Sequence, residues 1–183
     1  MNYRGEKIAF SRVVCLVLYR LFARHLPVSY QFGGKMGKYC RYKLCKHIFE
    51  SCGKNVNIEH GADFGNGLHV QIGDNSGMGI DCLVPNNIII GKDVMMGANC
   101  IILDKNHDFS RTDVPMWKQG FQERRRTVIG DDVWIGRDVR MTPGRTIKNG
   151  TIIAMGTVLT KDFPEYSVVG GNPSKLIKSR KNS

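Results

Sequence analysis

The stretch "IIIGKDVMMGANCIIL", residues 88–103, repeats a pattern every six residues. Ile90, Met96 and Ile102 mark successive hexads, and glycine follows the first two of them. The spacing persists through two runs of aliphatic residues: Ile72, Met78, Val84, Ile90, Met96 and Ile102, and then Ile129, Ile135, Met141, Ile147, Ile153 and Leu159. A period of six fits neither an α-helix nor a hairpin strand and is typical of parallel β-helices, in which three hexads close one coil. The sequence therefore predicts a mainly β fold, a prism with the marked side chains inside and glycine-rich corners.

The repeat divides the chain into a helical segment, a β-helix and a tail. A weaker run of hexads precedes the two strong ones, so only residues 1–51 are expected to lie outside the prism on that side. Two helical pieces, about 6–25 and 35–50, are separated by a segment in which proline and glycine break the helix. We expect these helices to cap the first coil, the β-helix to span 52–178, and residues 179–183 to form a basic tail.

The last part of the β-helix carries a helix-start signal. In "GGNPSKLIKS", residues 170–179, Asn172 can cap a helix and Pro173 can occupy its first position. We expect a short C-terminal helix here that closes the open end of the prism.

Positive charge is concentrated at the N-terminus. The chain carries a net charge of +11, and residues 1–54 hold 11 Lys and Arg against 2 Asp and Glu. Arg12, Arg20 and Arg24 recur on one face of the first helical piece, the pattern of a basic amphipathic helix that can make peripheral contact with anionic lipid through residues 6–25. The alternative is that the apolar face of this helix packs on the prism or on a neighbouring subunit.

The sequence argues against nucleic-acid binding, a membrane span and secretion. Residues 1–54 contain no recognisable nucleic-acid-binding motif, so no nucleic acid is expected. The longest apolar run is far short of the ~20 residues of a membrane span, and no cleavage signal follows it. We expect a cytoplasmic protein, with peripheral attachment at the inner membrane face as an option.

The cysteines and histidines argue against a metal centre. None of the six cysteines forms a C-x-x-C pair, and we expect reduced thiols, with Cys82 and Cys100 inside the prism. A carbonic-anhydrase-like site would need three histidines on neighbouring coils. His60 and His69 lie in early coils, out of register with His107, so no metal is expected.

The repeat is interrupted once, at "DKNHDF", residues 104–109. The residue six positions after Ile102 is charged, where the repeat requires an aliphatic side chain. The repeat resumes 27 residues after Ile102, and 27 is not a whole number of hexads. Residues 103–128 must therefore leave the prism as a loop, and a long loop on a rigid solenoid is more often functional than idle. His107 lies at its root, and imidazole suits the removal of a proton from an alcohol at neutral pH.

Residues 52–178 resemble the hexapeptide-repeat acyltransferases, whose prism is left-handed. The most specific segments are "NHDF" at 106–109, "IGDDVWIG" at 129–136 and "VLTKDFPEYSVVGGNP" at 158–173. The resemblance is closest to the maltose, galactoside and polysaccharide O-acetyltransferases. It implies a homotrimer with sites shared between subunits, acetyl-CoA as donor, a hydroxyl of a sugar or polysaccharide precursor as acceptor, and His107 as general base.

The resemblance also implies two sets of binding residues. Positions that match the family's CoA contacts are Trp134, Arg137, Met155, Thr160, Lys161, Lys175 and Lys178. On the acceptor side the candidates are Asp81, Asn86 and Asp108. Asp81 and Asp108, together with Asp104, are also candidates to orient the His107 ring, although each can equally be a solvated turn residue.

Three points stay open at the level of sequence. Transfer to the amine of an amino sugar and a non-catalytic β-helix scaffold are the alternatives to O-acetylation. The acceptor itself is not specified by the repeat. Arg145 falls where a buried aliphatic residue is usual, and an unpaired buried guanidinium would be costly, so it either pairs or points outward.

Overall fold

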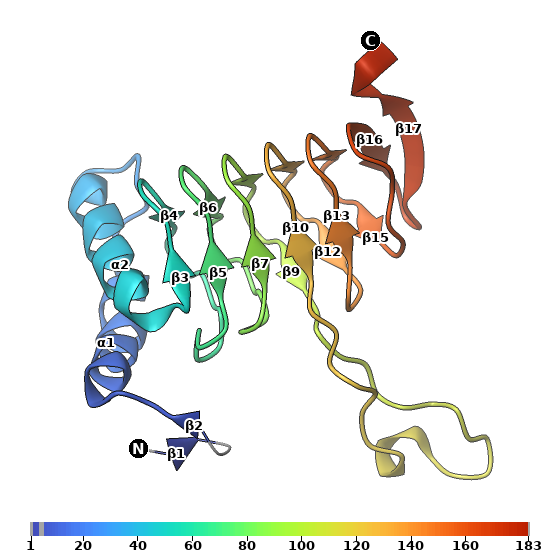
Figure 1. The fold of residues 1–183 in the computed structure, drawn as a ribbon, viewed down its shortest axis with the longest axis horizontal. Helices are drawn as coiled ribbons and strands as arrows, with labels where there is room; N and C mark the ends of the chain where they lie inside the picture. Colours follow the sequence, from blue (N-terminus) through green and yellow to red (C-terminus); the bar gives the residue numbers. More distant parts are fainter. Residues whose placement is uncertain (1, 4–5, 183) are drawn as a thin grey trace.

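The protein is a left-handed parallel β-helix with helices covering its N-terminal end and a β-hairpin at the other (Figure 1). This computed structural model describes residues 2–3 and 6–182. At the N-terminus, β1 (Asn2–Tyr3) pairs antiparallel with β2 (Glu6–Lys7). The prism that follows is made of short strands stacked in three faces.

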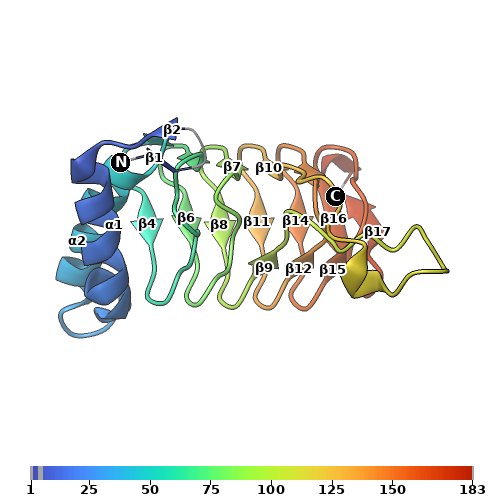
Figure 2. The same ribbon diagram turned by 90° about the horizontal axis from the view of Figure 1, so that it is seen from below.

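Each face is a ladder of parallel strands from successive coils (Figure 2). The first face contains β3 (Ser51–Cys52), β5 (Gln71–Ile72), β7 (Ile89–Ile90), β10 (Val128–Ile129) and β13 (Thr146–Ile147). The second contains β4 (Asn57–Ile58), β6 (Gly77–Met78), β8 (Met95–Met96), β11 (Trp134–Ile135), β14 (Ile152–Ile153) and β16 (Ser167–Gly170). The third contains β9 (Ile101–Ile102), β12 (Arg140–Met141) and β15 (Val158–Leu159).

The six-residue pattern correctly predicted the core. Gln71 pairs with Ile89 and Val128 pairs with Thr146, so each of these coils takes 18 residues, or three hexads. Of the twelve aliphatic residues marked in the sequence, eleven are buried and Met96 is half-buried. Their burial removes a continuous apolar column from water, which is the main force holding the coils together.

The corners of the prism need a backbone conformation that few residues tolerate. Asn55, Asn75 and Asp93 stack at one corner with φ values of 53°, 58° and 58°. Asn and Asp adopt this left-handed conformation more readily than other non-glycine residues. Their side chains also bond between coils, with Nδ2 to oxygen distances of 3.1 Å from Asn55 to Asn75 and 2.9 Å from Asn75 to Asp93. Each corner therefore fixes the position of the next coil.

The helical cap was predicted, but its orientation was not. Its elements are α1 (Phe10–Leu21), η1 (Ala23–His25) and α2 (Gly34–Ile48), and α1 begins at Phe10 instead of residue 6. Arg12 donates to the carbonyls of Ile48 and Leu68, at 2.5 and 2.9 Å. The arginines of α1 thus point at the prism, and most of its large apolar residues are exposed. The expected packing of the apolar face on the prism is therefore wrong, and the arginines do not face outward toward lipid.

A single buried arginine ties the cap to the first coil. The Arg41 side chain on α2 is fully buried. Its guanidinium donates to the carbonyls of Ile58 at 2.5 Å, Leu26 at 2.9 Å and Pro27 at 3.1 Å, and lies 3.5 Å from the Glu59 carboxylate. A planar group with five donors can satisfy several carbonyls at once, so one side chain joins α2, the turn before it and strand β4.

The predicted C-terminal helix was wrong. Residues Lys175–Ser179 form strand β17, which pairs antiparallel with β16, and only the single turn η3 (Arg180–Asn182) is helical. β16 is the last parallel strand and would leave a row of unpaired backbone groups at the edge, which β17 covers. Gly171, with φ of +96°, allows the chain to reverse there.

The tail beyond β17 is also attached to the prism. Arg180 lies 3.1 Å from the Asp132 carboxylate and donates to the Gly150 carbonyl at 2.6 Å, and Lys181 lies 2.6 Å from Glu165. Residue 183, the end of the expected basic tail, is outside the described residues.

All six cysteines are free thiols, and Cys82 and Cys100 are buried inside the prism as expected. In the described part of the chain, no helix is both long enough and apolar enough to cross a bilayer.

Candidate active site

The predicted loop leaves the prism between β9 and β10 and projects well away from it (Figures 1 and 2). Its two arms are held together by backbone hydrogen bonds near the root. Arg125 N donates to Asp104 O at 2.7 Å, and Gln122 N donates to Asn106 O at 2.9 Å. Asp108 N closes the next rung on a glycine carbonyl at 3.1 Å. The root of the loop is therefore ordered, and the 3₁₀ turn η2 (Met116–Lys118) lies farther out.

His107 occupies this ordered root. Its backbone forms an antiparallel bridge with Phe121 on the opposite arm. The two rings stack with centroids 4.3 Å apart and planes tilted by 32°. The Lys105 ammonium lies 3.7 Å from the centre of the same phenyl ring. The imidazole is thus supported on one side by Phe121 while the residue remains exposed to solvent.

A polar network joins the loop root to the prism corner beneath it. The Arg124 guanidinium lies 3.3 Å from the Asp104 carboxylate and 3.5 Å from the Asn86 amide oxygen. Asn86 in turn donates to Asn66 Oδ1 at 2.8 Å. Asn86 and Asp104 were expected near the site, and the structure places both beside the loop root. Arg124 was missed, although "ERRR" at 123–126, just before the register resumes, was a visible signal.

The other two acidic candidates lie in different surroundings. The Asp108 carboxylate accepts from Ser110 N at 3.0 Å, and hydrogen bonds from Ser110 hold the Asp108 pKa below its ordinary value. Asp81 lies at a corner between the second and third faces, with φ of 53°. The loop leaves from the corner after the third face, so Asp81 and His107 are on different edges of the same chain.

Three of the expected CoA-contacting residues lie close together on the second face. Trp134 on β11 is 52% exposed and pairs in the ladder with Met95 on one side and Ile152 on the other. Arg137 and Met155 follow at the next corner on successive coils, where Gly156 N donates to Arg137 O at 2.9 Å. Met155 is 71% exposed. The edge therefore offers an aromatic ring, a cation and a flexible apolar side chain to solvent.

Lys175 and Lys178 lie on β17, at the end of the same sheet, and both are exposed. Thr160 lies beside the turn that precedes β17, because its backbone N donates to Ser174 Oγ at 3.2 Å. The structure thus groups Thr160 with the two lysines at the C-terminal end of the prism. Lys161 is nearby in sequence, with its ammonium 5.6 Å from the Phe163 ring.

The question about Arg145 is resolved by its partners. Its guanidinium donates to the Thr160 carbonyl at 2.8 Å and lies 3.5 Å from the Asp162 carboxylate. Arg145 therefore pairs, and it ties the last coil to the segment that carries Thr160.

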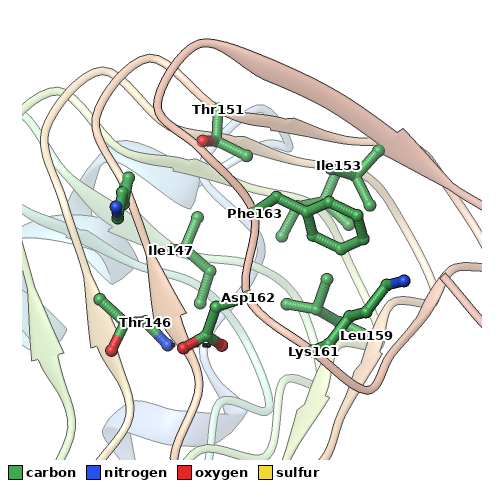
Figure 3. Close-up of a pocket in the computed structure, with 10 residues that line it drawn as sticks. Thr146, Ile147, Thr151, Ile153, Leu159, Lys161, Asp162 and Phe163 are labelled. Atoms are coloured by element: carbon green, nitrogen blue, oxygen red, sulfur yellow. Dashed lines mark hydrogen bonds between the residues drawn. The ribbon is translucent and has the colours of Figure 1, made fainter. Parts of the chain in front are cut away.

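Figure 3 shows a small cavity under Phe163 at the C-terminal end of the prism. Its volume is about 10 Å³, which is enough for one water molecule and too little for a substrate. A larger open groove of about 380 Å³ crosses the second face near the helical cap and is lined by Tyr30, Lys38, Asn57 and Met95, among others.

Within the described residues, no three His, Cys, Asp or Glu side chains come together in a way that could hold a metal ion. His60 Nδ1 lies 3.1 Å from the Leu26 carbonyl, within the contact between cap and prism.

Comparison with known proteins identifies this architecture. The family described as bacterial transferase hexapeptide (six repeats) matches residues 126–161, and the hexapeptide repeat of succinyl-transferase matches residues 87–102. A "Putative acetyltransferase" of Saccharomyces cerevisiae is 33% identical over 138 residues, which cover 74% of this chain and 69% of that protein. The crystal structure of a maltose O-acetyltransferase from Clostridium difficile 630 is 32% identical, with a TM-score of 0.73 and coverage of 92% of this chain and 86% of that one.

A shorter match is more similar in sequence. The chloramphenicol acetyltransferase of Klebsiella aerogenes is 48% identical over 60 residues, which cover 33% of this chain and only 29% of that relative. The hexad core, the loop with its histidine and the matches over most of two relatives agree. This chain belongs to the hexapeptide-repeat acetyltransferase family.

Proposed function

We propose that the protein transfers the acetyl group of acetyl-CoA to a hydroxyl group of a sugar or polysaccharide precursor. The observation that carries the proposal is the position of His107, exposed at the ordered root of the loop and supported by Phe121. Similarity to a maltose O-acetyltransferase over most of both chains supports a sugar as acceptor.

In this proposal His107 acts as general base. Its imidazole takes the proton of the acceptor hydroxyl while the oxygen attacks the thioester carbonyl of acetyl-CoA. The new C–O bond forms, the C–S bond breaks, and the CoA sulfur leaves with the pair of electrons from that bond. The proton held by the imidazolium then neutralises the thiolate, so that free CoA and the acetyl ester are released.

Phe121 would act as a positioning residue in this step. It holds the ring of His107 through a stacking contact and the backbone through the bridge. A general base must lie within hydrogen-bonding reach of its proton, so the orientation of the ring matters as much as its basicity. The Arg124–Asp104 ion pair and the contact of Arg124 with Asn86 would fix the loop root to the prism.

The donor would bind along the edge that carries Trp134, Arg137 and Met155. The pantetheine arm is extended and partly apolar, and an exposed aromatic ring with a flexible thioether provides suitable contacts. Lys175 and Lys178 on β17 would attract the CoA phosphates, since ammonium groups bind phosphate as point charges. Thr160 and Lys161 would border the same end of the channel.

We also propose that the active unit is a homotrimer. His107 and the Met155 edge lie at different corners of one prism, so a neighbouring prism is needed to bring a base and a donor channel together. The second face presents the side chains of Met95 and Trp134, 62% and 52% exposed, and burying them against a neighbour would be favourable. Light scattering should give about three times the chain mass of 20.6 kDa. A fully active monomer would contradict this assembly.

The experiment that tests the function is an acceptor screen that measures free CoA thiol. The panel should contain maltose, a galactoside, a glucosamine derivative with a free amine and chloramphenicol. Acetylation of a sugar hydroxyl, located by mass spectrometry, is the expected result. Transfer only to the amine would establish N-acetylation instead, and binding of acetyl-CoA without turnover of any acceptor would favour the scaffold alternative.

A further inference from the structure

The helical cap presents apolar side chains to solvent on its outer side. Six large apolar residues of α1 and its end are exposed by 39% to 79%, and their spacing of three or four residues places them along one stripe of the helix: Phe10, Val14, Val17, Leu18, Leu21 and Phe22. Tyr19 lies on the opposite side, buried against Phe64 with ring centroids 4.6 Å apart. The helix therefore packs inward with the side that carries Tyr19, Cys15 and Leu16 and leaves an apolar stripe outside.

The turn and the second helix extend this surface. Tyr30 and Phe32 in the turn are 77% and 102% exposed, and Met36 and Tyr39 on α2 are 65% and 59% exposed. Lysines alternate with these residues on the exposed side of α2: Lys35, Lys43 and Lys46. α1 and α2 pack against each other at the end of the prism, as Figure 1 shows. We call the exposed residues of these two helices and the turn the cap face.

The charge of the cap face is entirely positive. Residues 7–49 contain nine Lys and Arg and no Asp or Glu. The arginines among them are used inward: Arg20 and Arg24 pair with Asp63 at 3.4 and 3.1 Å, and Arg41 pairs with Glu59 at 3.5 Å. Two carboxylates of the prism thus pair with three of the four arginines. The exposed lysines of α2 face solvent, and residues 7–49 contain no acidic side chain to pair with them.

We propose that the cap face docks on the surface of a lipid bilayer that contains anionic lipids. Exposed Phe, Leu and Val side chains of α1 would enter the boundary between headgroups and acyl chains, as apolar stripes of interfacial helices do. Tyr39 would remain at headgroup level, because tyrosine combines an apolar ring with a polar tip. The lysines of α2 would lie against the lipid phosphates, where each basic residue adds measurable attraction.

The combination of features favours lipid over a protein partner. The apolar stripe of α1 can enter a deformable lipid surface without a groove that is complementary to it. The charged side chains of the cap face are all positive, which suits anionic headgroups. The prism would then project from the membrane with the His107 loop to its side (Figure 1). This inference concerns where the protein acts and does not depend on the proposed acetyl transfer.

Sedimentation with vesicles tests the proposal on the full-length protein. One set of vesicles is phosphatidylcholine alone, and the other contains about 30% phosphatidylserine. We expect binding to the anionic vesicles that weakens with salt, since surface charges are screened within about a Debye length. Lys43→Gln combined with Lys46→Gln should weaken binding by roughly fivefold per lysine. Leu21→Gln combined with Phe22→Gln should weaken it by at least about tenfold.

A matched control removes the same charge elsewhere. Lys92→Gln combined with Lys148→Gln alters two exposed lysines at one corner of the prism and should leave vesicle binding unchanged. Thermal melts of all variants show that loss of binding is not loss of folding. Binding that is absent at every lipid composition, or that is equal in the cap-face and control variants, would overturn the proposal. If the Leu21→Gln and Phe22→Gln protein instead loses oligomeric mass while the parent binds no vesicles, the cap face is an interface between copies of the chain.

Discussion

Replacing Arg41 by methionine should strongly destabilise the joint between the helical cap and the prism. The guanidinium is fully buried, donates to the carbonyls of Ile58, Leu26 and Pro27, and faces the Glu59 carboxylate at 3.5 Å. Methionine has a similar length but offers no donor, so the carbonyls and the carboxylate would stay buried with their partner removed. Breaking a buried ion pair from one side costs about 3–5 kcal/mol, because the remaining charge is left uncompensated.

That free energy translates into a large change in melting temperature. For a chain of this size each kcal/mol corresponds to about 2–4 °C, so Arg41→Met should lower Tm by about 6–20 °C. Differential scanning calorimetry measures the shift directly. Circular dichroism at the helix wavelength should show α1 and α2 melting earlier than in the parent protein.

Arg111→Met is the matched control, because it removes an arginine that also pairs with a carboxylate. Arg111 lies 2.5 Å from Asp113 in the projecting loop, but both side chains are more than 60% exposed. Exposed pairs contribute little to stability, so Tm should barely change. Equal shifts for the two variants would refute the conclusion that burial makes Arg41 the anchor of the cap.

The remaining predictions concern pH, the donor and the orientation of the base. Burial raises the pKa of Glu59, but hydrogen bonds to its carboxylate and the nearby guanidinium outweigh burial and hold the pKa below its ordinary value. Glu59→Gln should therefore destabilise the protein above the ordinary glutamate pKa of about 4.3. The difference from wild type should shrink as the pH falls below that value, where the unfolded chain takes up the proton first, and through the lower pKa of the folded chain. Thermal melts from neutral to acid pH measure this, and a difference that stays constant would contradict it. Lys175→Ala and Lys178→Ala should each raise the KM for acetyl-CoA and leave the KM for the acceptor unchanged, and the rise should be smaller at high salt. Initial rates with each substrate varied separately measure the two constants. A rise in the KM for the acceptor alone would place the donor elsewhere. Phe121→Ala should lower kcat with little change in the KM for acetyl-CoA. Phe121→Tyr should restore much of kcat, because it keeps the stacking with His107. A kcat for Phe121→Tyr as low as that of Phe121→Ala would contradict a positioning role.

The hexad pattern predicted the prism because its period is imposed on every coil. Each marked residue must enter the same apolar column, so the positions of Ile90, Met96 and Ile102 already specify which side chains point inward. The loop at 103–128 was found for the same reason, as the place where the period fails. Its ordered root was not foreseeable, since the bridge between His107 and Phe121 depends on how two arms fold back on each other.

The errors lie where tertiary contacts outweigh local signals. Asn172 and Pro173 are good helix-start residues, but the open edge of β16 recruits the next segment as strand β17. The spacing of Arg12 suggested a residue that faces lipid headgroups, yet its guanidinium donates to the carbonyls of Ile48 and Leu68 at the end of the prism. A sequence period shows which residues share a helix face and does not show which way that face points.

The most direct test of the proposed chemistry is turnover by the His107→Ala variant. With the acceptor found in the screen, kcat should fall by about 10²–10⁴-fold, the usual contribution of a general base, while the affinity for acetyl-CoA changes little. His47→Ala, at an exposed histidine on α2, is the matched control and should keep full turnover. Turnover near the wild-type level by His107→Ala would contradict the assignment of the base and with it the account of the site.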